Sequence, residues 1–92
     1  MFSLQNQTAF ISGASRGLGE QFALTLAKAG ADLILTSRDA SALTKIKKQV
    51  EDLGRRCETI ALDVRSHESI VAAVAEAKQR VEKIDILVNN AG

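Results

Sequence analysis

The chain has 92 residues, of which 46% are hydrophobic and 25% are charged, and its formal net charge is +1. These values are typical of a folded soluble domain and exclude a disordered tail, a polyanion-binding protein and a membrane-surface protein. We therefore expect one domain, residues 1–92, with neither nucleic-acid nor membrane partners.

Cysteine usage and the N-terminus bear on location. Cys57 is the single cysteine, which rules out an internal disulfide and a cysteine-based metal site, and favours a reducing, cytoplasmic setting. The first residues lack the charged and apolar regions of a signal peptide, and no apolar run reaches the length of a membrane span.

Short apolar runs alternate with segments of helical period along the chain. The runs lack the polar alternation of half-exposed strands, as expected when both faces of a parallel sheet are covered. We predict strands at 8–12, 32–36, 58–62 and 84–88, and helices at 18–29, 40–53 and 68–81. Such an order predicts an α/β fold of the Rossmann type, a doubly wound parallel sheet of four strands and three helices in the order 3-2-1-4.

Each predicted helix has an apolar stripe that we expect to face the sheet. Asp39 and Ser66 precede two of the stripes as N-caps, and Gly30 and Gly54 follow two of them as left-handed C-caps. The stripes consist of Phe22, Ala23, Leu26 and Ala27, then Leu43, Ile46, Val50 and Leu53, then Ile70, Val71, Val74, Ala77 and Val81.

This topology places two helices on one face of the sheet and the third alone on the other face. We expect the second face to be half bare, and the strand at 84–88 to form an apolar, unpaired edge. The sequence therefore predicts that these 92 residues are part of a longer enzyme.

Three glycines, Gly13, Gly17 and Gly19, follow the first strand and open the first helix. Their spacing is G-x-x-x-G-x-G, which differs from the G-x-G-x-x-G dinucleotide fingerprint but serves the same physics. Gly13 permits a tight turn, Gly17 lets a phosphate approach the backbone, and Gly19 lets the helix lie against the sheet. The helix N-terminus offers unpaired N–H groups and a positive dipole end to a diphosphate, and Ser15 adds a hydroxyl.

The other predicted strands also end in polar residues. Ser37 and Arg38 follow the second strand, Asp63 and Val64 follow the third, and the run 89–92, Asn-Asn-Ala-Gly, follows the fourth. Ligands of open parallel sheets bind outside the carboxyl ends of the strands, so we expect these groups to share one crevice with the glycine turn.

In these motifs, SGASRGLG, LDV and NNAG, in this order and each at a strand end, the chain resembles the short-chain dehydrogenase/reductase family. The resemblance covers essentially the whole chain but only the N-terminal part of the family's usual length, and Ser12 stands where the family usually has Thr. It implies that Asn89 braces the fourth strand. It also implies cofactor contacts by Ser15, Gly17 and Leu18 to the phosphates, by Asp63 and Val64 to the adenine, and by Asn90, Ala91 and Gly92 on the ribose side.

Charge favours NADP(H) over NAD as the cofactor. An NAD site of this fold has an acid at the end of the second strand, where this chain has Ser37. Arg16 and Arg38 provide two guanidinium groups for a 2′-phosphate. Asp39 is the opposing signal, which we assign to starting the next helix.

The family's chemistry is hydride transfer between a nicotinamide and a carbonyl or alcohol, with a tyrosine, a lysine and a serine assisting. The chain contains no tyrosine, and His67 lies at a helix start where a solvated or capping role is expected, so we assign no catalytic residue. We expect the 92 residues alone to be inactive and the full enzyme to be a homo-oligomer. The alternatives are a stand-alone dinucleotide-binding module and a ligand-free interaction domain.

Overall fold

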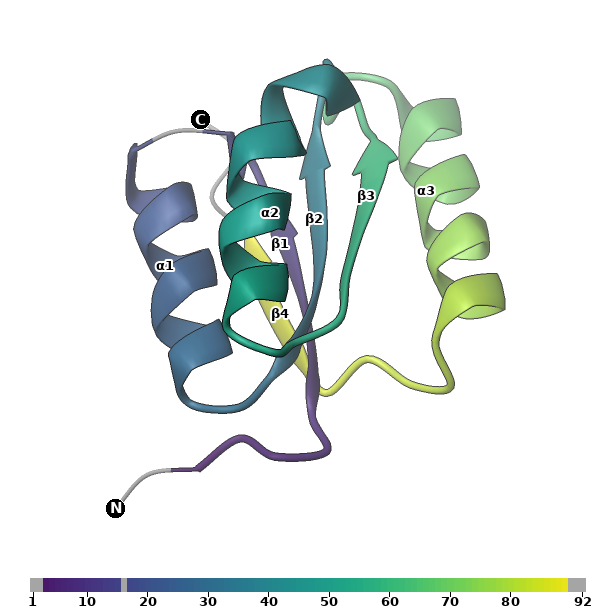
Figure 1. Cartoon of the computed structure of the whole chain (residues 1–92). Helices are drawn as coiled ribbons and strands as arrows, with labels where there is room; N and C mark the ends of the chain where they lie inside the picture. Colours follow the sequence, from purple (N-terminus) through teal and green to yellow (C-terminus); the bar gives the residue numbers. More distant parts are fainter. Residues whose placement is uncertain (1–2, 16, 90–92) are drawn as a thin grey trace.

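The computed structural model describes residues 3–15 and 17–89, which form a parallel sheet with helices on both faces (Figure 1). The strands lie in the order β3-β2-β1-β4, which confirms the predicted fold class. The elements in chain order are β1 (Thr8–Ser12), α1 (Gly17–Lys28), β2 (Asp32–Ser37), the 3-10 helix η1 (Ala40–Leu43), α2 (Thr44–Asp52), β3 (Cys57–Ala61), α3 (His67–Arg80) and β4 (Ile86–Asn89).

Alternate residues of the central strands β1 and β2 are buried on opposite faces of the sheet, because successive side chains of a strand point to opposite sides. Ile11 and Leu35 belong to the core beneath α1 and α2, whereas Phe10 and Ile34 belong to the core beneath α3. In the register Phe10 lies beside Ile34, so each core is built from matched positions of neighbouring strands. Figure 1 shows the resulting layers, with α1 and α2 on one side of the sheet and α3 on the other.

The capping residues act as the sequence predicts. The Asp39 carboxylate accepts a hydrogen bond from the Ser41 N–H, and Ser66 Oγ accepts one from the Ser69 N–H at the start of α3. Gly30 and Gly54 have φ angles of 106° and 83°, which reverse the chain after α1 and α2.

Two elements begin two or more residues away from the prediction, and the other boundaries differ by at most one residue. The predicted helix 40–53 begins as the separate 3-10 turn η1 because the Ala42 N–H bonds three residues back to the Asp39 carbonyl, at 3.0 Å. Strand β4 begins at Ile86, two residues later than expected. Asp85 bonds Thr8 on both sides: its N–H donates to the Thr8 carbonyl at 2.8 Å, and its carboxylate accepts the Thr8 N–H at 2.9 Å. A side chain thus replaces the first rung of the β1–β4 ladder.

The buried faces of the helices are narrower and smaller than the predicted stripes. In α1 the buried residues are Gly19, Ala23 and Ala27, and Phe22 is 42% exposed. Leu53, beyond the end of α2, is 44% exposed. The prediction was wrong at these larger residues because small side chains let a helix approach the sheet closely, which turns its bulkier neighbours outward.

Helix α3 shows the same effect more strongly. Ala73 and Ala77 are its buried residues, whereas Ile70, Val71 and Val74 are 37%, 54% and 37% exposed. Their exposure contradicts the predicted stripe at these three positions.

The second face of the sheet is buried at Phe10 and Ile34 of the central strands, so it is less bare than predicted, and its exposed part lies at the edge strand β4. Helix α3 contacts β3, and Arg80 in its last turn donates to the Glu58 carboxylate on that strand at 3.1 Å. On the edge strand, Leu87 is paired with Phe10 and is 72% exposed. Among residues 3–15 and 17–89, no helix has both the length and the apolar character needed to span a bilayer.

Burial of Cys57 gives a simple test of the core. The side chain is 2% exposed, and burial raises the pKa of its thiol to about 12. We expect Cys57 to resist a disulfide reagent such as DTNB in native buffer at pH 8, because the thiolate is the reacting form, and to react fully in denaturant. Rapid stoichiometric labelling of the native protein would contradict the burial.

Candidate functional site

Backbone hydrogen bonds outside the sheet ladders connect the carboxyl ends of neighbouring strands. After β1, the Ala14 N–H donates to the Thr36 carbonyl on β2 at 3.1 Å. After β3, the Leu62 N–H donates to the Ser37 carbonyl at 2.9 Å. The turns that follow β1 and β3 are therefore both fixed to the end of β2.

Side chains extend this connection across β1. The buried Thr36 hydroxyl donates to the Ile11 carbonyl at 3.2 Å. Ser12, 5% exposed, donates to the Asn89 side-chain oxygen at 3.1 Å and is within 3.4 Å of the Val88 carbonyl. Asn89 braces β4 against β1, as the resemblance implied.

The connection between β1 and α1 contains two glycines with left-handed backbone conformations. Gly13 and Gly17 both have φ angles of 65°, in the left-handed region that side chains disfavour. Gly19 is buried on the face of α1 against the sheet, Ser15 is half-buried, and Leu18 is 61% exposed. Gly17 is therefore at the surface, whereas Gly19, two residues later, lies against the sheet.

Open space lies over the start of α1. A Cβ placed on Gly17 would have none of the atoms tested in the described residues within 4 Å. Helix α1 begins at this glycine, so the N–H groups of its first turn have no partners within the helix, and the positive end of its dipole lies here. This geometry fits a diphosphate, which needs close approach to bare amides.

A polar, a basic and an acidic residue follow one another at the end of β2. Ser37 is half-buried and Arg38 is exposed. The neighbouring Asp39 carboxylate accepts from the Ser41 hydroxyl at 2.6 Å and from the Ser41 N–H at 3.0 Å, and these bonds lower the pKa of Asp39. Asp39 is therefore the N-cap of η1, as the sequence analysis proposed, and it keeps its negative charge.

Asp63 follows β3 and is held by its own loop. Its carboxylate accepts from the Arg65 side chain at 3.1 Å and 3.2 Å and from the Arg65 N–H at 3.0 Å. The side-chain bonds of Arg65, then its backbone bond, lower the pKa of Asp63, and the charge of Arg38 acts in the same direction. Val64 is 45% exposed beside it, so an apolar surface adjoins the carboxylate.

Sequence reasoning missed three residues that shape this edge: Thr36, Arg65 and Ser69. The Asp63 N–H donates to Ser69 Oγ at 2.9 Å, and Ser69 is in turn bonded to the N-cap Ser66. The spacing Ser-x-x-Ser at a helix start could have suggested the link to Ser69. Four expected site residues, Arg16, Asn90, Ala91 and Gly92, lie outside the described residues.

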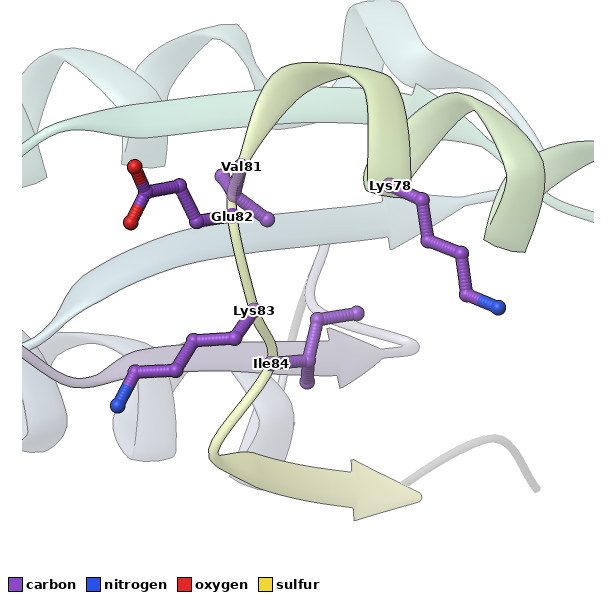
Figure 2. A pocket seen from close by; sticks show the side chains of 5 residues that line it. All are labelled: Lys78, Val81, Glu82, Lys83 and Ile84. Carbon is purple, nitrogen blue, oxygen red and sulfur yellow. The ribbon is translucent and has the colours of Figure 1, made fainter.

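A hollow of about 380 Å³ lies elsewhere, where α3 leads into β4 (Figure 2). Figure 2 shows Val81 and Ile84 pointing to one side of this connection, and Glu82 and Lys83 to the other. Both apolar residues pack against the core beneath α3. The hollow follows the C-terminal end of α3 and precedes β4, so it is remote from the strand ends that carry the candidate site.

Side chains that could bind a metal ion do not cluster in the part of the chain that the structure describes. Residues 3–15 and 17–89 contain no group of three or more His, Cys, Asp or Glu side chains that could hold a metal ion. His67 is exposed as the first residue of α3.

The glycine turn and the linked strand ends belong to a Rossmann-like α/β fold, here with four strands and three helices. A family profile described as short chain dehydrogenase matches residues 7–92. The chain belongs to the short-chain dehydrogenase family. Oxidoreductase UcpA from Salmonella typhimurium is 45% identical over 92 residues, which are 100% of this chain and 35% of UcpA. The chain thus spans about a third of the length of the curated relatives it matches.

Solved structures agree with this assignment. A dehydrogenase/reductase from Sinorhizobium meliloti superposes with a TM-score of 0.92 and 38% identity, over 98% of this chain and 36% of that one. A metagenomic short-chain oxidoreductase in complex with NADP has a TM-score of 0.92 and 35% identity, over 97% and 40% of the two chains. Carveol dehydrogenase from Mycobacterium avium in complex with NAD has a TM-score of 0.91 and 34% identity, over 100% and 38%.

The left-handed start of α1 can be tested by stability. We expect Gly17→Ala to lower the free energy of unfolding by about 1–2 kcal/mol, because a side chain is strained at this φ although space is open. Gly17→Asn should lower it less, because Asn tolerates the left-handed region. Urea unfolding measures both, and an Ala variant as stable as the wild type would contradict the geometry.

Proposed function

We propose that the protein is an oxidoreductase that transfers a hydride between NADP(H) and a carbonyl or alcohol substrate, and that the residues described form its cofactor-binding part. Membership of the short-chain dehydrogenase family supports the reaction class. The observation that carries the proposal is the open backbone at Gly17, where a left-handed turn meets the start of α1.

In this proposal the diphosphate lies against the first turn of α1. The N–H groups of Gly17 and Leu18 and the Ser15 hydroxyl donate to its oxygens, and the helix dipole adds a favourable field. Gly13 and Gly19 act indirectly, since one shapes the turn and the other holds α1 close to the sheet. Asn90, Ala91 and Gly92 line the ribose side by the family resemblance.

The choice of NADP(H) over NAD rests on charge at the end of β2. Ser37 takes the position of the acid that would bind a ribose 2′-hydroxyl, and Asp39 is engaged with Ser41. Arg38 is exposed next to them, and Arg16 adjoins Gly17 in the sequence. Relatives of this fold bind either cofactor, because the superposed structures include complexes with NADP and with NAD.

The adenine in this proposal lies at the end of β3. Asp63 accepts a hydrogen bond from the exocyclic amino group, and the exposed Val64 packs against the ring. Bound NADP(H) supplies or receives the hydride. With no tyrosine in these 92 residues, we assign them no proton transfer and propose that they are inactive alone.

We also propose a cytoplasmic location and a homo-oligomeric full enzyme. The first is supported by Cys57, a free thiol buried in the core, as suits a reducing compartment. The second rests on the family resemblance.

Binding can be separated from folding at two left-handed glycines. Gly17→Asn should weaken NADPH binding by about tenfold to a hundredfold, because its side chain occupies the space a phosphate needs and removes charge-assisted bonds. Gly54→Asn is the matched control, since Gly54 also has a positive φ and open space but lies beyond α2. Calorimetric titration of the intact protein measures both. No NADPH binding by the wild type, or equal losses in both variants, would refute the proposed site.

Cofactor choice is tested at the two arginines. Replacing Arg16 and Arg38 together by Ala should weaken NADPH binding by about a hundredfold and leave NADH binding nearly unchanged, because only NADPH carries the 2′-phosphate. Lys48→Ala, which removes an exposed charge on α2, is the control for general electrostatics. Equal losses for the two cofactors would remove the NADP(H) assignment but leave the dinucleotide site.

A further inference from the structure

The main chain of Asp63 is fixed independently of its side chain. Its N–H donates to Ser69 Oγ at 2.9 Å, and its carbonyl accepts from the Ser66 N–H at 3.0 Å. Both partners lie at the start of α3, one as its N-cap and the other in its first turn. The freedom that remains at Asp63 is therefore rotation of its side chain.

Arg65 removes that freedom. Its Nε and Nη2 donate to the two carboxylate oxygens of Asp63, at 3.1 Å and 3.2 Å, in the forked geometry of a bidentate pair. The Arg65 N–H adds a third bond, to Oδ1, at 3.0 Å. Both the rotamer and the plane of the carboxylate are thereby set.

Stability alone gives little reason for this pair. The Arg65 side chain is 71% exposed and that of Asp63 is 33% exposed, and exposed ion pairs contribute little to folding. A fixed carboxylate is worth more to a ligand, because immobilising a free side chain on binding reduces affinity.

The bonds also leave room for one more donor. A carboxylate has about four lone-pair positions. Within the described residues Oδ1 accepts two bonds and Oδ2 accepts one, from Arg65 Nη2. The remaining position on Oδ2 can accept one N–H, and the exposed Val64 adjoins the same loop as an apolar surface for a ring.

From these contacts we infer that Arg65 is a positioning residue that makes the site select a purine with an exocyclic amino group, such as adenine, over one with an oxo group, such as hypoxanthine. Arg65 does this through Asp63, whose fixed carboxylate accepts from the amino group and repels the oxo group. The inference rests on the proposed dinucleotide site and adds to it a base selectivity that depends on Arg65.

The test compares NADPH with nicotinamide hypoxanthine dinucleotide phosphate, by calorimetric titration of the intact protein. We expect Arg65→Ala to weaken NADPH binding about three- to fivefold without weakening the binding of the hypoxanthine analogue, so that the affinity ratio falls. Arg65→Lys keeps the charge but loses the fork, so its ratio should fall as well. Lys48→Ala controls for loss of an exposed positive charge and should keep the wild-type ratio.

A double-mutant cycle shows whether Arg65 acts through Asp63. In an Asp63→Ala background, Arg65→Ala should change NADPH affinity no further, because the carboxylate that it holds is gone. Circular dichroism of each variant checks the fold. Because the Arg65 side chain is exposed, we expect its replacement to leave the fold unchanged.

The outcomes are distinct for the two proposals. If the wild type binds neither dinucleotide, the proposed function fails and this inference with it. If the wild type binds NADPH but Arg65→Ala keeps the wild-type ratio, or binds NADPH more tightly, the inference on Arg65 alone is overturned. An equal effect of Arg65→Ala with and without Asp63 overturns it too.

Discussion

The register of the parallel strands is the constraint on which the candidate site depends. Because β1, β2 and β3 run the same way, their following loops emerge at one edge of the sheet, and two backbone bonds fix those loops to the end of β2. Each such hydrogen bond contributes only about 0.5–1.5 kcal/mol to the free energy of folding, so these bonds alone do not set the register. A slip of one residue would turn Phe10 and Ile11 to the wrong cores, and that packing cost holds the edge in place.

Close packing of α1 connects the core to the surface. Gly19, Ala23 and Ala27 bring the helix axis near the sheet, which directs its N-terminal turn over the end of β1. The left-handed angles at Gly13 and Gly17 then reverse the chain without covering the amides with side chains. The same small residues that make the helix pack well thus determine where its dipole points.

At the carboxyl edge of the sheet, each acidic side chain is hydrogen-bonded by a residue of its own loop. The two carboxylates that follow β2 and β3 are both engaged locally, Asp39 by Ser41 and Asp63 by Arg65. Acidic groups near a strand end would oppose an anionic ligand if they faced it. Arg38 and the ionised Asp39 are both exposed after β2, with Asp39 bonded to Ser41, and this arrangement underlies the proposed preference for a phosphorylated ribose.

The sequence by itself determined the order of elements, the sheet topology, the caps and the left-handed glycines, because these depend on local period, backbone conformation and the handedness of crossovers. It predicted the side of α1 and α3 that faces the sheet, through Ala23, Ala27 and Ala77, but not how narrow the buried face is. Phe22 and Ile70 belong to the predicted stripes but are exposed, because the helices lie so close to the sheet that only small side chains fit between them. The fork of Arg65 on Asp63 likewise came only from the tertiary structure, since any nearby cation could have paired with that carboxylate, and the bonds of Ser66 and Ser69 to the Asp63 main chain decided its geometry.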